Sequence, residues 1–157
     1  MSHWIKWSAI CLALALLAGA VEKVPLDKVP EPILAAVKAR FGEPELVSVE
    51  KYGEENAVYF DVELKDKGHK FDLDMMEDGT ILEIEKQVAV KDLPDVCAKA
   101  VEAKYPTATI SDVMEVSKVE DKVETLDRYE VSLELPDKTS HDIDVSLDGK
   151  TITEEKP

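Results

Sequence analysis

The sequence contains few of the residues that crosslink small folds. Of its two cysteines, Cys11 lies in an N-terminal apolar run and only Cys97 follows that run. A single thiol cannot form an internal disulfide, so the fold must be stable without one. Cys97, Val101 and Tyr105 recur at the spacing of one helix face, where a free cysteine behaves as a small hydrophobe. We therefore expect Cys97 to be buried and unreactive.

Histidines and catalytic motifs are also scarce. Beyond the N-terminal run there are only His69 and His141, each near an expected turn or strand start and without a second ligand at metal-binding spacing. There is no G-x-S-x-G motif, phosphate-binding loop or Cys/His pair. Carboxylates are abundant, but an open sheet offers them no pocket that excludes water. We predict a protein that is not an enzyme and that has no catalytic residues, metal centre or cofactor.

Basic residues are also few relative to acidic ones. Acidic residues number 34 against 19 lysines and arginines, which leaves a formal net charge of −15. A field of this sign repels nucleic acids and anionic lipids. It is compatible with a basic partner, with bound cations or with solubility alone.

Only one long apolar run is present, at 10–20, and it follows Lys6 and ends in Ala18-Gly19-Ala20. A basic start, a short apolar core and small residues at alternate positions are typical of a signal peptide, which we place at 1–20. A transmembrane helix needs about 20 apolar residues, so an uncleaved anchor is the less favoured alternative. We expect a periplasmic or secreted protein without membrane contact after signal cleavage.

A stretch at 24–41 occurs a second time at 88–105, which indicates one supersecondary unit used twice. In each copy a proline precedes apolar residues spaced four apart, and a glycine or proline follows them, which predicts helices at 31–41 and 95–105. The identical positions are Val24/Val88, Pro30/Pro94, Ala36/Ala100, Val37/Val101 and Ala39/Ala103.

Four stretches after each helix alternate between apolar and polar residues with period two, which is typical of half-buried antiparallel strands. Asp-Gly pairs at 78–79 and 148–149 predict hairpin turns. The second half has a longer charged hairpin at 120–127. The predicted strands are 46–52, 58–64, 71–76, 81–88, 110–117, 129–135, 141–145 and 151–153.

These elements predict an α+β fold of two tandem α-β-β-β-β repeats, at 21–87 and 88–157. A single helix covers one side of its four strands, and two such halves can join into one larger antiparallel sheet with both helices packed on one face. The other face of the sheet would then stay open to water.

The open face carries the candidate binding residues, because the acidic sides of the strands would meet there. Like charges opposite one another destabilise a sheet, so this face either meets a basic partner or is a heavily solvated surface. Asp72, Asp74 and Asp78 approach the calcium-loop pattern, but the third acid is one residue late and the first two lie in a strand, so we expect no calcium loop. The predicted partner-binding residues are Tyr59, Asp61, Asp72, Asp74, Glu130, Asp142 and Asp144.

Each half has the same order of features: Leu/Val-Pro, a short helix ending in an aromatic residue with Gly or Pro, an aromatic-acid-Val strand and an Asp-Gly hairpin. The helix ends are Phe41-Gly42 and Tyr105-Pro106, and the aromatic-acid-Val strands contain Phe60-Asp61-Val62 and Tyr129-Glu130-Val131. This order resembles the exported PepSY-like proteins, which are similar to the β-lactamase inhibitor protein fold. The resemblance implies a periplasmic or secreted module that binds or inhibits other envelope proteins through its open sheet face.

The sequence thus predicts an exported binding module, such as an inhibitor or regulator of a protease or another envelope protein. Its partner is expected to be a basic protein of the cell envelope rather than a nucleic acid. The alternative is a protein that binds or buffers cations such as calcium with the same carboxylates.

Overall fold

The computed structural model describes residues 21–54 and 57–154, so the predicted signal peptide at 1–20 lies outside the described residues. A helix followed by four strands occurs twice in the chain. None of the helices in the described ranges is long and apolar enough to cross a membrane. The first unit comprises β1 (Glu22–Lys23), a 3₁₀ turn η1 (Leu26–Lys28), α1 (Glu31–Phe41), β2 (Glu45–Glu54), β3 (Ala57–Asp66), β4 (His69–Met76) and β5 (Ile81–Val88). The second comprises η2 (Val90–Asp92), α2 (Asp95–Lys104), β6 (Thr109–Glu120), β7 (Val123–Glu134), β8 (Ser140–Ser146) and β9 (Ile152–Glu154).

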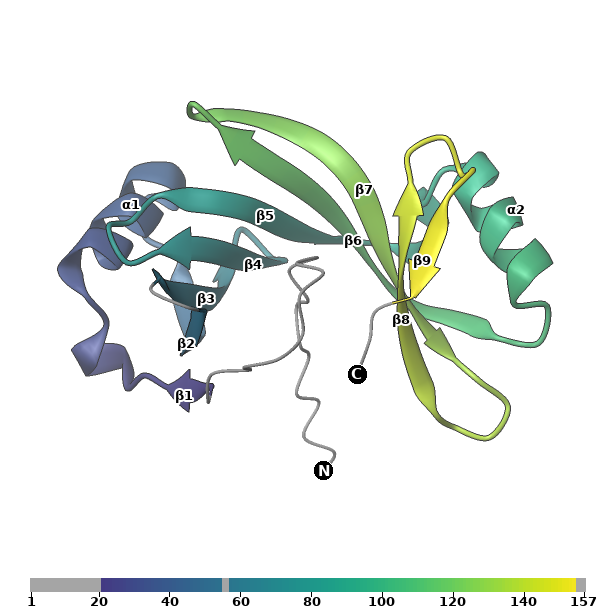
Figure 1. Cartoon of the computed structure of the whole chain (residues 1–157), viewed down its shortest axis with the longest axis horizontal. Helices are drawn as coiled ribbons and strands as arrows, with labels where there is room; N and C mark the ends of the chain where they lie inside the picture. Colours follow the sequence, from purple (N-terminus) through teal and green to yellow (C-terminus); the bar gives the residue numbers. More distant parts are fainter. Residues whose placement is uncertain (1–20, 55–56, 155–157) are drawn as a thin grey trace.

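The nine strands of the described residues form one antiparallel sheet in the order of the sequence. The two halves join where β5 pairs with β6, from Glu83 opposite Lys118 to Val88 opposite Val113. Figure 1 shows a strongly bent sheet, with α1 and α2 on its outer side at opposite ends. The face without helices therefore lines the inside of the bend. This confirms the predicted α+β class and antiparallel sheet.

Each helix covers its own hydrophobic core. In α1, Pro32 is tolerated in the first turn, where its missing N–H has no partner to lose. Ile33 and Val37 turn inward, as do Cys97 and Val101 of α2. Gly42 ends α1 with a positive φ of 85°, and its N–H donates to the Lys38 carbonyl at 2.8 Å. The cores are Val29, Ile33, Val37, Val49, Phe60, Val62, Leu64, Leu73, Met75 and Ile84, and Leu93, Cys97, Val101, Val113, Tyr129, Val131, Leu133, Ile143 and Val145.

The longer charged hairpin predicted at 120–127 is present, but its strands extend further than predicted. β6 continues to Glu120 and β7 begins at Val123, so only Asp121 and Lys122 form the turn, with φ of 51° and 66°. Positive φ at both turn residues matches the twist of the paired strands. The extra residues therefore lengthen the ladder instead of forming a loop.

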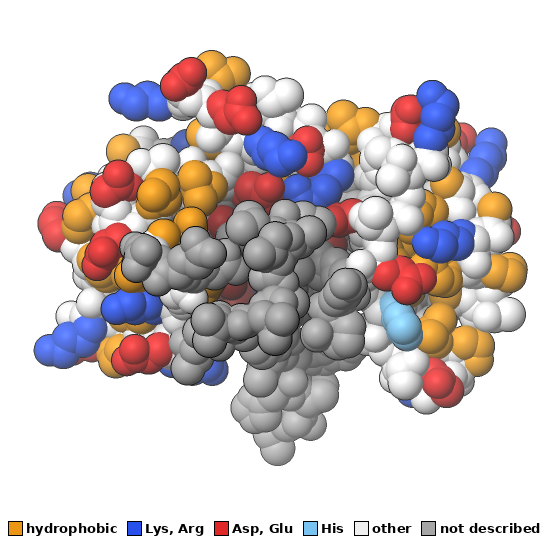
Figure 2. Space-filling view, in the orientation of Figure 1, with side chains coloured by type: hydrophobic (Ala, Val, Ile, Leu, Met, Phe, Trp, Pro, Cys, Tyr) orange, Lys and Arg blue, Asp and Glu red, His pale blue; other side chains and the backbone are white. Residues whose placement is uncertain are grey.

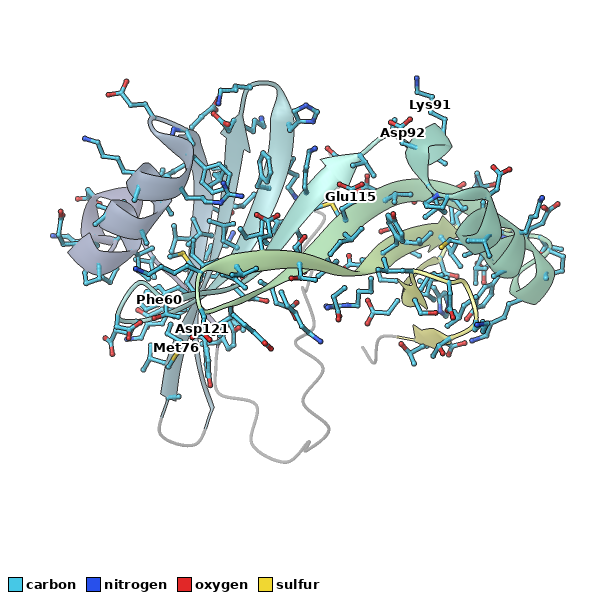
Figure 3. All side chains as sticks on the ribbon, turned by 90° about the horizontal axis from the view of Figure 1, so that it is seen from above. Phe60, Met76, Lys91, Asp92, Glu115 and Asp121 are labelled. Carbon is cyan, nitrogen blue, oxygen red and sulfur yellow. The ribbon has the colours of Figure 1, made fainter. Side chains whose placement is uncertain are left out.

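The extended hairpin reaches from the second half back to the first. Figures 1 and 3 show its tip, labelled at Asp121 in Figure 3, over the first half. Val119 packs against the first core, and Arg40 of α1 forms an ion pair with Glu124 of β7. The hairpin therefore ties the two halves together in addition to the β5–β6 ladder.

The two Asp-Gly turns pack against the first turns of the helices. Gly79 has a φ of 88°, and a Cβ on it would lie 2.5 Å from the Pro32 carbonyl oxygen. Gly149 has a φ of 69°, and a Cβ on it would lie 2.7 Å from the Val96 carbonyl oxygen. Both turns thus need glycine for the backbone conformation and for the close approach to a helix.

We expect Gly79→Ala to lower the free energy of unfolding by about 3 kcal/mol, because a β-carbon adds a backbone clash to the strain of a left-handed conformation. Gly68→Ala is the matched control: its φ is 84°, but nothing lies within 4 Å of its Cβ position. The control should cost only about 1 kcal/mol. Urea denaturation measures both values, and equal losses would show that the contact with α1 does not constrain the turn.

Candidate functional site

Acidic side chains line the inside of the bend, on the face without helices. The strand register places Asp61 opposite Asp74, and Asp74 opposite Glu83. In the second half, Glu130 lies opposite Asp144. Like charges directly opposite each other across strands repel. We define the acidic face as Asp61, Glu63, Asp72, Asp74, Glu83, Glu85, Glu130, Asp142 and Asp144.

Much of the acidic face is buried, contrary to the expectation that it would be open to water. The exposed fraction is 5% for Asp74, 4% for Glu85 and 6% for Asp144. The sheet bends toward this face, so side chains from neighbouring strands crowd together there. Met114 and Val116 of β6 are buried on the same face, opposite Gln87 and Glu85 of β5. The carboxylates are thus held in a partly apolar environment.

Burial and mutual repulsion change the acidity of these carboxyls. Burial, followed by the charges of Asp72 and Asp74, raises the pKa of Asp61 to about 8. Burial and then Glu83 raise the pKa of Asp74 to about 7. Burial and the charge of Glu130 hold the pKa of Glu85 well above its usual value. Near neutral pH the acidic face therefore retains protons that exposed carboxylates would have lost.

Arg128 of β7 supplies positive charge at the junction of the two halves. Its Nη1 and Nη2 donate to the two carboxylate oxygens of Glu83 at 3.2 and 3.1 Å, and its Nε donates to Asp144 at 2.9 Å. The Arg128 side chain is only 12% exposed. Burial lowers the pKa of its guanidinium, but the bonds to Glu83 and Asp144 outweigh burial and hold it above the ordinary value. Arg128 thus bridges β5 of the first half and β8 of the second.

The first half has a different arrangement around its carboxylates. The rings of Tyr52 and Tyr59 stack with centroids 5.5 Å apart and planes 20° apart. The Tyr52 hydroxyl donates to Asp74 Oδ1 at 3.2 Å. At the other end of the strands, Lys70 contacts Glu63 at 3.0 Å and Asp72 at 3.3 Å. Figure 2 shows acidic and basic side chains next to one another just above the centre of the view.

A family model described as "Putative beta-lactamase-inhibitor-like, PepSY-like" matches residues 18–83 and, in a second match, residues 58–153. The chain belongs to this PepSY-like family. No curated protein matches the sequence. The crystal structure of a BLIP-like protein from Bacteroides fragilis is similar, with 17% identity, a TM-score of 0.55 and coverage of 80% of this chain and 85% of that one. A crystal structure from Bacteroides eggerthii that is described as "putative periplasmic proteins" is also similar. Its sequence identity is 11% and its TM-score 0.61, with coverage of 80% of this chain and 88% of that one. At these identities the likeness establishes the fold alone.

In this PepSY-like chain, the seven predicted site residues all belong to strands that contribute to one face. Four of them lie on β3 and β4 and three on β7 and β8, with β5 and β6 in between. The residues predicted from the sequence do not include Tyr52, Glu83, Glu85 or Arg128. Arg128 could have been found, because it is one of only two arginines in the sequence and alternates in step with Glu130.

Three carboxylates of this PepSY-like chain could together approach a cation. Asp74, Glu83 and Glu85 each offer one oxygen, and these oxygens lie within 4.8 Å of one another. Their origin in two adjacent strands differs from the single loop that the calcium pattern would need. Asp78 instead caps its own hairpin turn by accepting from the Thr80 N–H at 2.9 Å.

Proposed function

We propose that this PepSY-like protein is an exported, non-enzymatic binding module whose acidic face binds a basic surface on another envelope protein. The observation that carries the proposal is the pairing of like charges across β3, β4 and β5. Within the described residues, no salt bridge includes Asp61 or Asp74. A cationic group from a partner would favour the ionised form of these carboxyls and displace the protons that they retain near neutral pH, and electrostatic complementarity would direct its docking.

The similar solved structures support the proposed binding role and the proposed location. One structural neighbour is described as BLIP-like and another as periplasmic. We infer a periplasmic or secreted location after cleavage of residues 1–20, with the α-β-β-β-β repeats at 21–87 and 88–157. A role as inhibitor or regulator follows if the protein captured by the acidic face is an enzyme.

We expect the exported protein, immobilised as bait, to retain a basic envelope protein at low salt and release it at moderate salt, because salt screens such contacts. The triple variant Asp61→Asn, Asp72→Asn, Asp74→Asn should lose at least ~90% of this capture. Neutral side chains also relieve repulsion within the face, so the variant should remain folded. Lysine is not used at these positions, because Asp72 and Asp74 are buried and a buried ammonium group would destabilise the fold.

The matched control neutralises three exposed carboxylates elsewhere, with Glu31→Gln, Glu43→Gln and Glu102→Gln. It changes the net charge by the same amount and should capture the partner as the native protein does. Equal capture by both triple variants would contradict the proposal, because retention would then reflect net charge alone.

The second candidate function is cation binding, which the Asp74, Glu83 and Glu85 geometry favours. Calcium binds six to eight oxygen ligands, so water would complete the coordination of these three. If the bait captures nothing, a melting temperature raised by millimolar calcium but not by magnesium at equal ionic strength would support this candidate. No calcium-specific rise would exclude it.

A further inference from the structure

The two halves present the same strand register around a pair of opposed carboxylates. In the first half Asp61 of β3 lies opposite Asp74 of β4, and Tyr59 lies opposite Met76. In the second half Glu130 of β7 lies opposite Asp144 of β8, and Arg128 lies opposite Ser146. Tyr59 in the first half thus occupies the register position that Arg128 has in the second.

The second half shows how this arrangement holds a guanidinium. Arg128 lies diagonally across from Asp144, and its Nε donates to the Asp144 carboxylate at 2.9 Å. The same guanidinium also donates to both oxygens of Glu83. Such charge-assisted, two-point bonds are the geometry that carboxylates offer to arginine.

In the first half no arginine forms an ion pair with the opposed carboxylates within the described residues, although the charge of Arg128 acts to lower the pKa of Asp74. After burial, the charges with the largest effect on Asp61 are those of Asp72, Asp74, Glu50 and Glu63, all of them carboxylates. In place of an arginine, Tyr59 presents a ring stacked on Tyr52. Asp61 and both tyrosines are partly exposed, so a side chain from a partner can reach them.

From this juxtaposition we infer that Asp61, Asp74 and the Tyr52–Tyr59 stack form a binding site for an arginine side chain of the partner protein. The inference rests on the proposed function and names the chemistry that the acidic face recognises. The guanidinium would take the position next to Asp74 that the Arg128 guanidinium takes next to Asp144.

The chemistry of the site favours arginine over lysine. A guanidinium is planar, stacks on aromatic rings and binds a carboxylate with two parallel hydrogen bonds. It is also more weakly hydrated than an ammonium group, so entering a partly buried site costs it less. The Tyr52–Tyr59 stack supplies the aromatic surface, and Asp61 and Asp74 supply the acceptor oxygens. A cation near an aromatic ring gains further attraction when water is excluded.

The test is an NMR titration of the exported, isotope-labelled protein with the capped tripeptide Gly-Arg-Gly and, separately, Gly-Lys-Gly. We expect the arginine peptide to shift the resonances of Tyr52, Tyr59, Asp61 and Asp74, with an affinity at least fivefold that of the lysine peptide. Asp61→Asn and Tyr59→Ala should each weaken arginine binding at least tenfold. Glu102→Gln removes an exposed carboxylate of α2, outside the acidic face, and should leave the affinity unchanged within about twofold.

A second variant introduces an arginine into the first half at the register position that Arg128 occupies in the second half. Tyr59→Arg supplies an internal guanidinium beside Asp74, so it should abolish peptide binding and raise the melting temperature at pH 7.5. Tyr59→Phe retains a stacking ring and should bind the arginine peptide as the native protein does. Undiminished binding by Tyr59→Arg would overturn the inference.

The remaining outcomes separate this inference from the proposed function. If both peptides bind the acidic face with equal affinity, the face is a general cation-binding surface and the arginine site is wrong. If the arginine peptide shifts resonances only outside these four residues, the site is also wrong, although the proposed function can stand. If neither peptide binds and the capture experiment retains no protein, both are wrong.

Discussion

Replacing Arg128 with methionine is expected to lower the free energy of unfolding at pH 7.5 by about 3–5 kcal/mol, the range for breaking a buried ion pair. The loss is large because the Glu83 and Asp144 carboxylates lose the cation that balances them in a buried site. Asp144 is 6% exposed, so water cannot replace the guanidinium effectively. Urea denaturation of the native protein and the variant measures the difference.

Arg40→Met is the matched control for this prediction. Arg40 is the other arginine of the sequence, and its ion pair with Glu124 also joins the two halves. The Arg40 and Glu124 side chains are 49% and 37% exposed, so the control should cost no more than about 1 kcal/mol. Equal losses from the two variants would show that the Arg128 contacts do not hold the halves together.

A rescue experiment distinguishes lost charge balance from lost packing in the Arg128 variant. Adding Glu83→Gln and Asp144→Asn to Arg128→Met removes the charges that the guanidinium balanced. We expect the triple variant to regain about half or more of the lost stability, because the isolated buried charges account for most of the cost. A triple variant less stable than Arg128→Met would instead assign the loss to packing.

Lowering the pH from 8 to 5 is expected to stabilise the folded protein, whereas proteins with salt-bridged carboxylates lose stability as the pH falls. The folded pKa values of Asp61 and Asp74 are about 8 and about 7, above the ordinary value of 3.8. Between these limits the folded state binds more protons than the unfolded state, so the free energy of unfolding decreases as the pH rises. The stabilisation is complete below about pH 4, decreases progressively above it, and is fully lost once the pH exceeds the folded pKa values of about 7 and about 8.

The expected gain between pH 8 and pH 5 is about 3 kcal/mol. One pKa unit corresponds to about 1.4 kcal/mol, and neighbouring carboxyls share part of their mutual repulsion. Carboxylates with lowered pKa values, such as Asp137 with its hydrogen bonds from Thr139, gain protons only below this pH window. They therefore do not oppose the effect.

Asp61→Asn provides the decisive comparison for the pH dependence. The variant should be more stable than the native protein at pH 8, and its stability should change less between pH 8 and pH 5. Asp137→Asn, at an exposed position, should leave the slope unchanged. Chemical denaturation at several pH values measures these differences, and a native protein that loses stability from pH 8 to 5 would contradict the predicted protonation of the acidic face.

Local patterns in the sequence were sufficient for most elements of the fold. The prediction of α1 at 31–41 is confirmed, and that of α2 is confirmed except that Tyr105 follows the last helical residue. Period-two alternation also identified which strand residues face the cores. Cys97 is fully buried as predicted, and burial raises the pKa of its thiol. These features depend on neighbours within a few residues, so a single sequence contains enough information to predict them.

Alternation also placed the acidic residues on a common face, but it could not tell how far that face is exposed. Period two shows which side of a strand a residue occupies, while exposure depends on how the whole sheet bends. The partners of Arg128 follow from the same bend and from strand pairing: Glu83 is 45 residues away and Asp144 is 16 residues away in the sequence.

The sequence by itself determined two helices, the alternating strands, the Asp-Gly turns and the excess of acid on one side of the sheet, because each results from local sterics, periodicity or composition. Only the tertiary structure decided that much of the acidic face is buried, that Arg128 joins the two halves and that Tyr52 stacks on Tyr59 near Asp74. The physical reason is that desolvation and charge pairing depend on which distant strands come within a few ångströms. Sheet pairing and curvature set those distances.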